Sequence, residues 1–308
     1  MIRMIVGRLV SGIVVLAAVA TIAFLLLKAA PGGPFSSERR LHPAVERSIE
    51  ERYHLRDPLW QQYGRYLGDL ARLDLGQSMK RPETVGAIIR RHFPHSAAIG
   101  LLAIGFAALL GTALGVVAAH RRNTWVDYLA MAIAIAGVAT PALVLGPLVI
   151  RFFALELGWI PAGRADTAIG YLAPALVLGL IYAGTIARLA RAGMIEALAT
   201  DFVRTARAKG ASERRVVWRH ALRVGALPVV SYLGPATAGL ISGSFVVEKI
   251  FQIPGLGFYF VESVTNRDYP VLTGLLVFYV AILVALNLVV DLAYGWLDPR
   301  LRGPGGPP

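Results

Sequence analysis

Few residues in this chain stand at spacings that could support catalysis or metal binding. His92 and His95 lie three residues apart, as two zinc ligands on one helix can, but Pro94 falls between them and no carboxylate is near. The sequence contains no GxxxxGK(S/T) loop to cradle nucleotide phosphates, no HExxH zinc pattern and no GxSxG nucleophile pattern. It also contains no cysteine, which excludes thiol catalysis and disulfides. We therefore expect no catalytic residue, no metal site and no cofactor bound by this chain. Energy for any active transport must come from another chain or from an ion gradient.

A basic segment at 188–223 is the most informative stretch of the sequence. Its 36 residues carry nine lysines and arginines against three acids, and long apolar runs lie on both sides of it. Apolar spacing predicts a first helix over 196–209, which Gly210 can end in the left-handed conformation. Ser212 is then a natural N-cap for a second helix that runs to about Val224. The apolar residues of this second helix are Val216, Val217, Trp218 and Leu222.

The charge and helical pattern of this basic segment allow three interpretations. Its charge could suit DNA, but attachment to a membrane at both ends argues against nucleic acid. A solvated loop that only fixes orientation is the second interpretation. The helix–turn–helix pattern favours the third, a structured element that docks a partner in the cytoplasm.

The elements that hold this segment are membrane helices. Of the 308 residues, 56% are hydrophobic and 16% are charged, whereas a soluble domain carries roughly a quarter charged residues. Six runs come near the roughly 20 apolar residues that a helix needs to cross a bilayer. They are 9–27, 96–119, 128–155, 169–187, 227–247 and 272–292. Pro141 and Pro147 predict a kink in the third run rather than a break into two elements. The expected fold class is an all-α integral membrane protein with six transmembrane helices and a small extracytoplasmic helical segment.

Charge placement predicts the orientation. The formal net charge of +12 fits the positive-inside bias, because the short inner segments hold fifteen lysines and arginines and the short outer segments hold four. Both termini are therefore expected in the cytoplasm. The first run is expected to stay as an uncleaved signal anchor, because Lys28 stands where cleavage requires a small residue. The expected divisions are 1–30, a tail and first helix; 31–95, an extracytoplasmic segment; 96–298, a transmembrane core with the basic loop at 188–224; and 299–308, a cytoplasmic tail.

The extracytoplasmic segment shows helical apolar spacing at 44–53, 60–73 and 85–92, with prolines between. Trp60, Tyr63, Tyr66 and Leu67 form a stripe on one face of the second of these helices. This pattern predicts an amphipathic cap on the outer face of the membrane. The same cap could serve as a platform for an external partner.

Small and polar residues recur within the spans. Gly111 with Gly115 and Gly239 with Gly243 form GxxxG pairs, which predict close helix packing. Polar side chains of the fifth span could line a translocation path; they are Ser231, Thr237, Ser242 and Ser244. Four further polar residues lie near the membrane interfaces, where snorkelling and interhelical hydrogen bonds explain them; they are Arg151, Glu156, Asn287 and Asp291.

Motifs along nearly the whole chain resemble the peptide-type permeases of ABC importers. Residues 205–210 (TARAKG), followed by Ser212, Glu213, Arg214 and Val216 and then by 219–223 (RHALR), resemble their cytoplasmic coupling loop. Similar stretches occur at 30–35 (APGGPF), 73–78 (LDLGQS), 121–128 (RRNTWVDY), 253–257 (IPGLG), 267–271 (RDYPV) and 297–300 (LDPR). The resemblance is closest to the first transmembrane subunit of bacterial oligopeptide permeases.

The resemblance implies the type I ABC importer permease fold and a non-catalytic subunit that moves peptides, in particular oligopeptides, across the bacterial inner membrane. It implies four kinds of companion: a second homologous permease subunit, two cytoplasmic ATPases that use ATP and Mg, an extracytoplasmic peptide-binding protein and the peptide itself. The residues expected to couple this chain to the ATPases are Glu196, Asp201, Arg204, Thr205, Ala206, Arg207, Ala208, Lys209, Gly210, Ala211, Ser212 and Glu213.

An ion-driven carrier or channel is the alternative class. Such a protein is expected to hold acids at span centres or to break its helices around an ion. The predicted spans offer no acid at a centre, and the large docking loop favours the ATP-driven class. The sequence leaves the cargo open among an oligopeptide, a dipeptide, a nickel chelate and an antibiotic.

Overall fold

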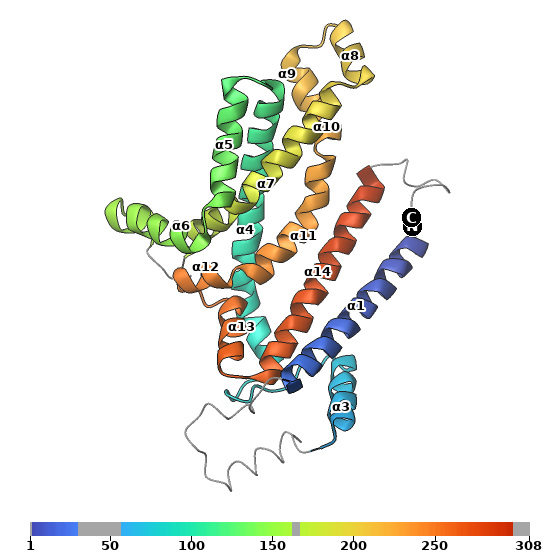
Figure 1. Cartoon of the computed structure of the whole chain (residues 1–308), viewed down its shortest axis with the longest axis vertical. Coiled ribbons are helices and arrows are strands. Elements are labelled where there is room, and N and C mark those ends of the chain that lie inside the picture. Colours follow the sequence, from blue (N-terminus) through green and yellow to red (C-terminus); the bar gives the residue numbers. More distant parts are fainter. Residues whose placement is uncertain (1, 30–56, 162–166, 298–308) are drawn as a thin grey trace.

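The computed structural model describes residues 2–29, 57–161 and 167–297. Within these ranges the chain consists of helices, connecting turns and one isolated antiparallel bridge between Gln77 and Thr84. Figure 1 shows α8 at one end of the molecule and α3 at the opposite end, and we call these the α8 end and the α3 end. The elements in chain order are α1 (Ile2–Ala29), α3 (Leu59–Ala71), α4 (Val85–His120), α5 (Trp125–Ala139), α6 (Ala142–Val149), η1 (Ile150–Glu156), η2 (Ala168–Tyr171), α7 (Leu172–Leu198), α8 (Asp201–Ala208), α9 (Glu213–Arg215), η3 (Val216–Ala221), α10 (Leu222–Gly225), α11 (Leu227–Gly243), α12 (Phe245–Ile250), α13 (Leu256–Thr265) and α14 (Tyr269–Leu297).

Five stretches are long and apolar enough to cross a bilayer, and a sixth is formed by two helices bent relative to each other. The five are Val6–Ala29, Val85–His120, Ala168–Leu198, Leu227–Ile250 and Tyr269–Leu292. The predicted all-α membrane fold is confirmed. Two spans are longer than predicted: α4 includes the expected outer helix at 85–92, and α7 continues through the first part of the basic segment to Leu198.

The expectation of a mere kink in the third span is wrong. Trp125–Ala139 and Ala142–Glu156 meet at an angle of 100°. The cause is local, because a residue before proline is driven out of the helical region. Thr140 has ψ 116° and Pro141 has ψ 140°, so two extended residues separate α5 from α6. Pro147, by contrast, is accommodated inside α6.

The centre of the fold is a close three-helix packing of α4, α5 and α7, which Figure 1 shows side by side. A Cβ added at Gly111 would stand 2.6 Å from the carbonyl oxygen of Ala183, and one at Gly115 would stand 2.5 Å from that of Ala187. Both distances are shorter than any real contact, so this GxxxG pair serves backbone packing as predicted. The same device joins α7 to α5, where a Cβ at Gly184 would meet the Ala134 carbonyl oxygen at 2.1 Å.

The helices α1 and α14 pack against each other beside this centre (Figure 1). Arg8 and Asp291 form an ion pair across them, with 2.8 Å between Nε and Oδ2. Arg151 and Glu156 pair within η1 at 3.1 Å and are both exposed. The predicted explanation by interhelical pairing is confirmed for Asp291.

At the α3 end, the amphipathic helix α3 packs on the end of α1. The Tyr63 hydroxyl lies 2.7 Å from Thr21 Oγ1, and the Phe24 ring lies 5.4 Å from the Tyr63 ring and 5.7 Å from the Tyr66 ring. The predicted stripe is therefore a packing face at its tyrosines, although Trp60 is 72% exposed. The helix expected at 44–53 lies outside the described residues.

The two histidines near the start of α4 each have a hydrogen-bond partner on another element. His92 Nδ1 lies 2.8 Å from the carbonyl oxygen of Pro254, and His95 Nδ1 lies 2.6 Å from the Tyr171 hydroxyl. Within the described ranges, no group of three or more metal-ligating side chains occurs.

Candidate coupling surface

The basic segment folds as two short helical stretches joined by a tight turn at the α8 end. The single helix predicted over 196–209 is wrong, because α7 ends at Leu198 and α8 starts at Asp201. Thr200 stands between them in an extended conformation with ψ 155° and takes the N-cap position. Asp201 follows in the first turn, where a negative charge stabilises the helix dipole. The pair Thr-Asp is a helix-start signal that the sequence already carried.

The turn after α8 is a complete Schellman motif. The Gly210 N–H donates to the Arg207 carbonyl at 2.9 Å, and the Ala211 N–H donates to the Ala206 carbonyl at 3.1 Å. These are the two bonds that close a helix when its next residue is left-handed. Gly210 has φ +80°, which confirms the predicted left-handed glycine.

Ser212 begins the second helical stretch, as predicted. Its backbone is extended with ψ 147°, and its carbonyl accepts from the Val216 N–H at 2.9 Å. Its hydroxyl makes no capping bond. Helical backbone then continues through α9, η3 and α10 to Gly225, with a π-helical turn in the middle.

An ion pair ties the two stretches together across the turn. Arg207 Nε lies 2.8 Å from Glu213 Oε1, and Arg207 Nη2 lies 3.3 Å from Oε2. This hydrogen-bonded guanidinium lowers the pKa of the Glu213 carboxyl below its ordinary value. Both side chains are exposed, so the pair orients the turn more than it stabilises the fold.

Apolar side chains anchor the segment to the membrane helices. Val203 of α8 and Val216 of η3 are completely buried against Met194 of α7 and Val116 of α4. Trp218 lies outside this cluster and is 51% exposed, contrary to its predicted place on the apolar side. The segment is therefore anchored to both α4 and α7.

A shallow groove of about 420 Å³ lies between α8 and η3. It is lined by Phe202, Thr205, Ala206, Lys209, Gly210, Ala211, Arg215 and His220. Five of these are predicted coupling residues, and Phe202, Arg215 and His220 were missed. Phe202 is 42% exposed, so the groove offers an apolar side chain beside basic ones. No side chain here stands as nucleophile or metal ligand, and the arrangement suits protein docking.

The other predicted coupling residues lie around the groove rather than in it. Glu196 is exposed on α7, and Asp201 lies 3.5 Å from Arg204 on the outer side of α8. Arg207, Ala208, Ser212 and Glu213 are exposed on the turn and its two flanking helices.

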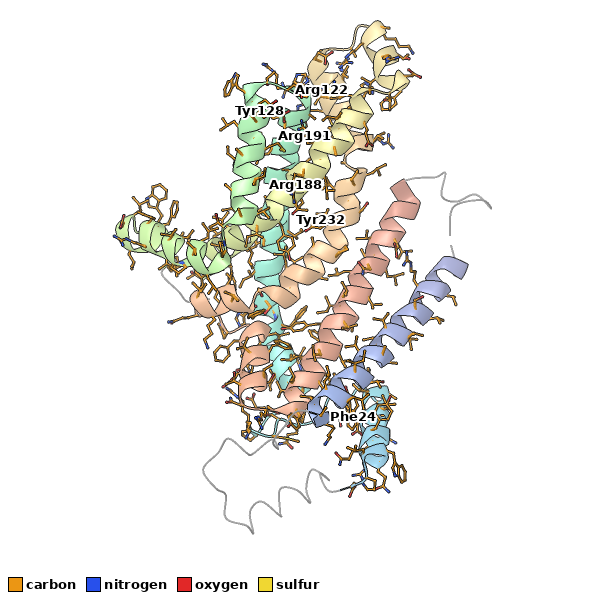
Figure 2. All side chains as sticks on the ribbon, viewed as in Figure 1. Phe24, Arg122, Tyr128, Arg188, Arg191 and Tyr232 are labelled. Carbon is orange, nitrogen blue, oxygen red and sulfur yellow. The ribbon has the colours of Figure 1, made fainter. Side chains whose placement is uncertain are left out.

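An ion pair with a buried carboxylate, which could not be read from the sequence, supports the α8 end. Arg191 of α7 donates two bonds of 2.7 Å to the carboxylate of Asp127, which is 2% exposed. The Asn123 N–H donates to the same carboxylate at 2.9 Å, so the pair fixes the turn between α4 and α5 against α7. Figure 2 shows Arg191 on α7 near the hairpin that carries Arg122 and Tyr128.

The candidate path residues occupy different environments on α11. The Ser231 hydroxyl donates to the Leu227 carbonyl at 2.9 Å, and that of Thr237 donates to the Leu233 carbonyl at 2.6 Å. Ser231 is exposed, whereas Thr237 is buried. Ser244 is completely buried and donates to Glu248, an acid that sequence reasoning did not single out. The side chain of Ser242 lies outside the described residues.

Comparison with known proteins identifies the family. Residues 111–303 match the family described as "Binding-protein-dependent transport system inner membrane component". A dipeptide transport system permease protein of Bacillus subtilis is 45% identical over 285 residues, covering 92% of each chain. An oligopeptide transport system permease protein of Haemophilus influenzae is 40% identical and covers 98% of this chain and 100% of its own length. A glutathione transport system permease protein of Escherichia coli is 37% identical over 98% of this chain and 99% of its own.

The fold has a counterpart among solved structures. A chain from inward-facing conformations of the MetNI methionine ABC transporter superposes with a TM-score of 0.59 at 19% identity, covering 68% of this chain and 96% of that one. This likeness confirms the ABC importer permease fold. The chain is a multi-pass inner membrane protein that belongs to the family of binding-protein-dependent transport system inner membrane components, and within it to the peptide permeases of ABC importers.

Proposed function

We propose that this chain is one of two homologous permease subunits between which a peptide crosses the inner membrane. The names of its relatives refer to a dipeptide, an oligopeptide and glutathione, all of them short peptides. Oligopeptides are the first cargo to test. An extracytoplasmic binding protein delivers the peptide, and two cytoplasmic ATPases drive the cycle.

The α8 end faces the cytoplasm in this proposal, with both termini on the same side. The fifteen-to-four bias of lysine and arginine supports this orientation. So does the course of α1 and α14, because α1 starts and α14 finishes toward the α8 end (Figure 1). The ATP and Mg are held by the ATPases, since this sequence has no phosphate-cradling loop.

The turn at residues 209–212 and the groove beside it form the coupling surface. The observation that carries this proposal is the combination of an exposed turn with a rigid attachment. Gly210 is exposed at the tip, while Val203 and Val216 are buried against α4 and α7. Motion imposed on the tip by an ATPase therefore reaches the membrane helices and shifts the equilibrium between inward-open and outward-open states.

The peptide path runs along α11. Ser231 is the best placed of the four candidate side chains, because it is exposed while Thr237 and Ser244 are buried. Ser242 stays a candidate on its position in the sequence.

Site-directed cross-linking tests the coupling surface. The chain has no cysteine, so Ala211→Cys can be introduced on a clean background. In the assembled transporter it is expected to cross-link to an ATPase subunit, with a yield that changes between nucleotide-free and ATP-bound states. Ala71→Cys, exposed at the α3 end, is the matched control and should give no ATPase cross-link. Failure to cross-link at every position from 206 to 214 would show that this turn is not the coupling element.

A further inference from the structure

Glu248 is a completely buried carboxylate on the short helix α12, which packs against α6 and α13. Its Oε1 accepts from the Ser96 hydroxyl of α4 at 2.7 Å and from the Ser244 hydroxyl. Its Oε2 accepts from the Gly257 N–H at 2.9 Å and the Phe258 N–H at 3.3 Å. An ionised carboxylate only accepts hydrogen bonds, and four donors offset the cost of taking it out of water.

The donors come from three separate elements and converge on the start of α13. The first N–H groups of a helix have no partner within the helix and attract negative charge. Glu248 accepts two of them in α13, and Ser96 Oγ accepts a third from Leu256 at 2.8 Å. The carboxylate therefore caps α13 and, through Ser96, fastens that cap to α4.

Both glycines of the 253–257 stretch (IPGLG) lie so close to this carboxylate that neither position has room for a side chain. A Cβ at Gly255 would stand 2.4 Å from Glu248 Oε2 and 2.6 Å from Ser96 Oγ. A Cβ at Gly257 would stand 2.9 Å from the same Oε2 and 2.5 Å from the Cα of Phe245. Any side chain at either position would displace the carboxylate from its donors.

The same region separates two groups of packed helices. α11 packs against α4, α7 and α14, whereas α12 packs mainly against α6 and α13. The junction between α11 and α12 is Ser244, which has ψ 2° and donates its hydroxyl to Glu248. The carboxylate thus holds the residue at which the long helix α11 ends.

We propose that Glu248 is a positioning residue for transport: its carboxylate fixes α12 and the start of α13 to α4, so that α11 rearranges about a stationary junction at Ser244. The inference rests on the proposed function in one respect, that α11 borders the peptide path. Without the carboxylate, the outer end of the path loses its fixed geometry and ATP hydrolysis is no longer converted into delivered peptide.

The test compares Glu248→Gln with Lys249→Gln in the assembled transporter reconstituted with its companion subunits. Glutamine keeps the shape of the side chain but turns one acceptor oxygen into a donor that faces other donors. Lys249 is the next residue, is exposed, and serves as the matched control. We expect the Glu248→Gln complex to assemble and hydrolyse ATP while the peptide delivered per ATP falls about tenfold, roughly the effect of one lost hydrogen bond to a charged group. Lys249→Gln should keep the wild-type ratio.

A purely structural role predicts a different result, namely fewer assembled complexes with an unchanged ratio of peptide to ATP, and that outcome overturns the proposal. If Glu248→Gln does not assemble, Ser244→Ala decides, because it removes a single donor; an unchanged ratio there also overturns it. Failure of the wild-type complex to import any peptide would instead refute the proposed function, independently of Glu248.

Spin labels on the exposed positions Lys249 and Leu101 supply a direct readout of the fixed junction. The distribution of distances between the two labels should be narrow, with the same mean in nucleotide-free and ATP-trapped wild-type transporter. In Glu248→Gln this distribution should broaden. A wild-type distance that changes with nucleotide would show that the junction moves and would end the proposal.

Discussion

Replacing Gly210 by valine should uncouple ATP hydrolysis from transport. Gly210 has φ +80°, and no heavy atom lies within 4 Å of a Cβ built there, so the substitution creates no collision with neighbouring residues. The cost is conformational: about 1–2 kcal/mol for any residue with a Cβ, and more for a β-branched one. If the backbone relaxes, the two Schellman hydrogen bonds are lost, at about 1 kcal/mol each. By either route the native turn loses about 2 kcal/mol, which corresponds to roughly a thirtyfold fall in its population.

The segment should nevertheless stay folded, because Val203 and Val216 remain buried against α4 and α7. Complexes are therefore expected to assemble at wild-type levels and to lose peptide uptake. Gly158→Val is the matched control: Gly158 has φ +63° and equally open surroundings, but it lies away from the α8 end. It should keep uptake. Gly210→Asn should recover part of the activity, since asparagine adopts left-handed backbone readily. Normal uptake by Gly210→Val, or equal losses in Gly158→Val and Gly210→Val, would refute the reasoning.

Three further predictions concern orientation and local stability. A cysteine at Ser212 should react with a membrane-impermeant maleimide only from the cytoplasmic side and one at Ala71 only from the opposite side; labelling of both from one side contradicts the topology. Asp127→Asn should lower the free energy of unfolding by about 2 kcal/mol, because Arg191 is left partly buried without its charged partner, and the melting temperature of the purified transporter should fall. A double-mutant cycle with Arg191→Gln should return a coupling energy well above zero. The hydrogen bond with Arg207 holds the folded-state pKa of the Glu213 carboxyl below its ordinary 4.5. The ion pair therefore orders the turn fully above pH 4.5, and this ordering is lost as the pH falls through the folded-state pKa. A spin label at Ser212 should therefore gain mobility only below about pH 4.5, and Glu213→Gln should give that mobility at every pH.

The membrane spans could be predicted from sequence because each is a long apolar run, whereas their interruptions could not. Within the membrane spans, Pro94, Pro147 and Pro235 lie inside helices, whereas Pro141 separates α5 from α6. Proline is thus accommodated within some helices and ends another. The difference depends on whether neighbouring helices hold the chain straight around the proline, which a single stretch of sequence does not contain.

The candidate site likewise contains features that the sequence predicts and features that it does not. The turn at Gly210 was predictable because its cause is local: a glycine follows a helical pattern and a helix-start signal follows the glycine. The carboxylates of Asp127 and Glu248 were missed because their partners are distant. Asp127 pairs with a residue 64 positions away, and Glu248 accepts from one 152 positions away. No spacing rule connects such residues before the helices are packed.

The unbroken course of α7 has a mechanical consequence. Its 27 residues span about 40 Å at 1.5 Å per residue, more than the roughly 30 Å of hydrocarbon in a bilayer. The same rod that packs on α4 and α5 through Gly184 and Ala187 therefore ends among the anchors of α8, at Met194 and Ala197. A rod of that length would act as a lever arm: a tilt of about 5° about one end moves the other by about 3.5 Å. A displacement of that size at the α8 turn would therefore accompany a reorientation of α7 through the full thickness of the membrane.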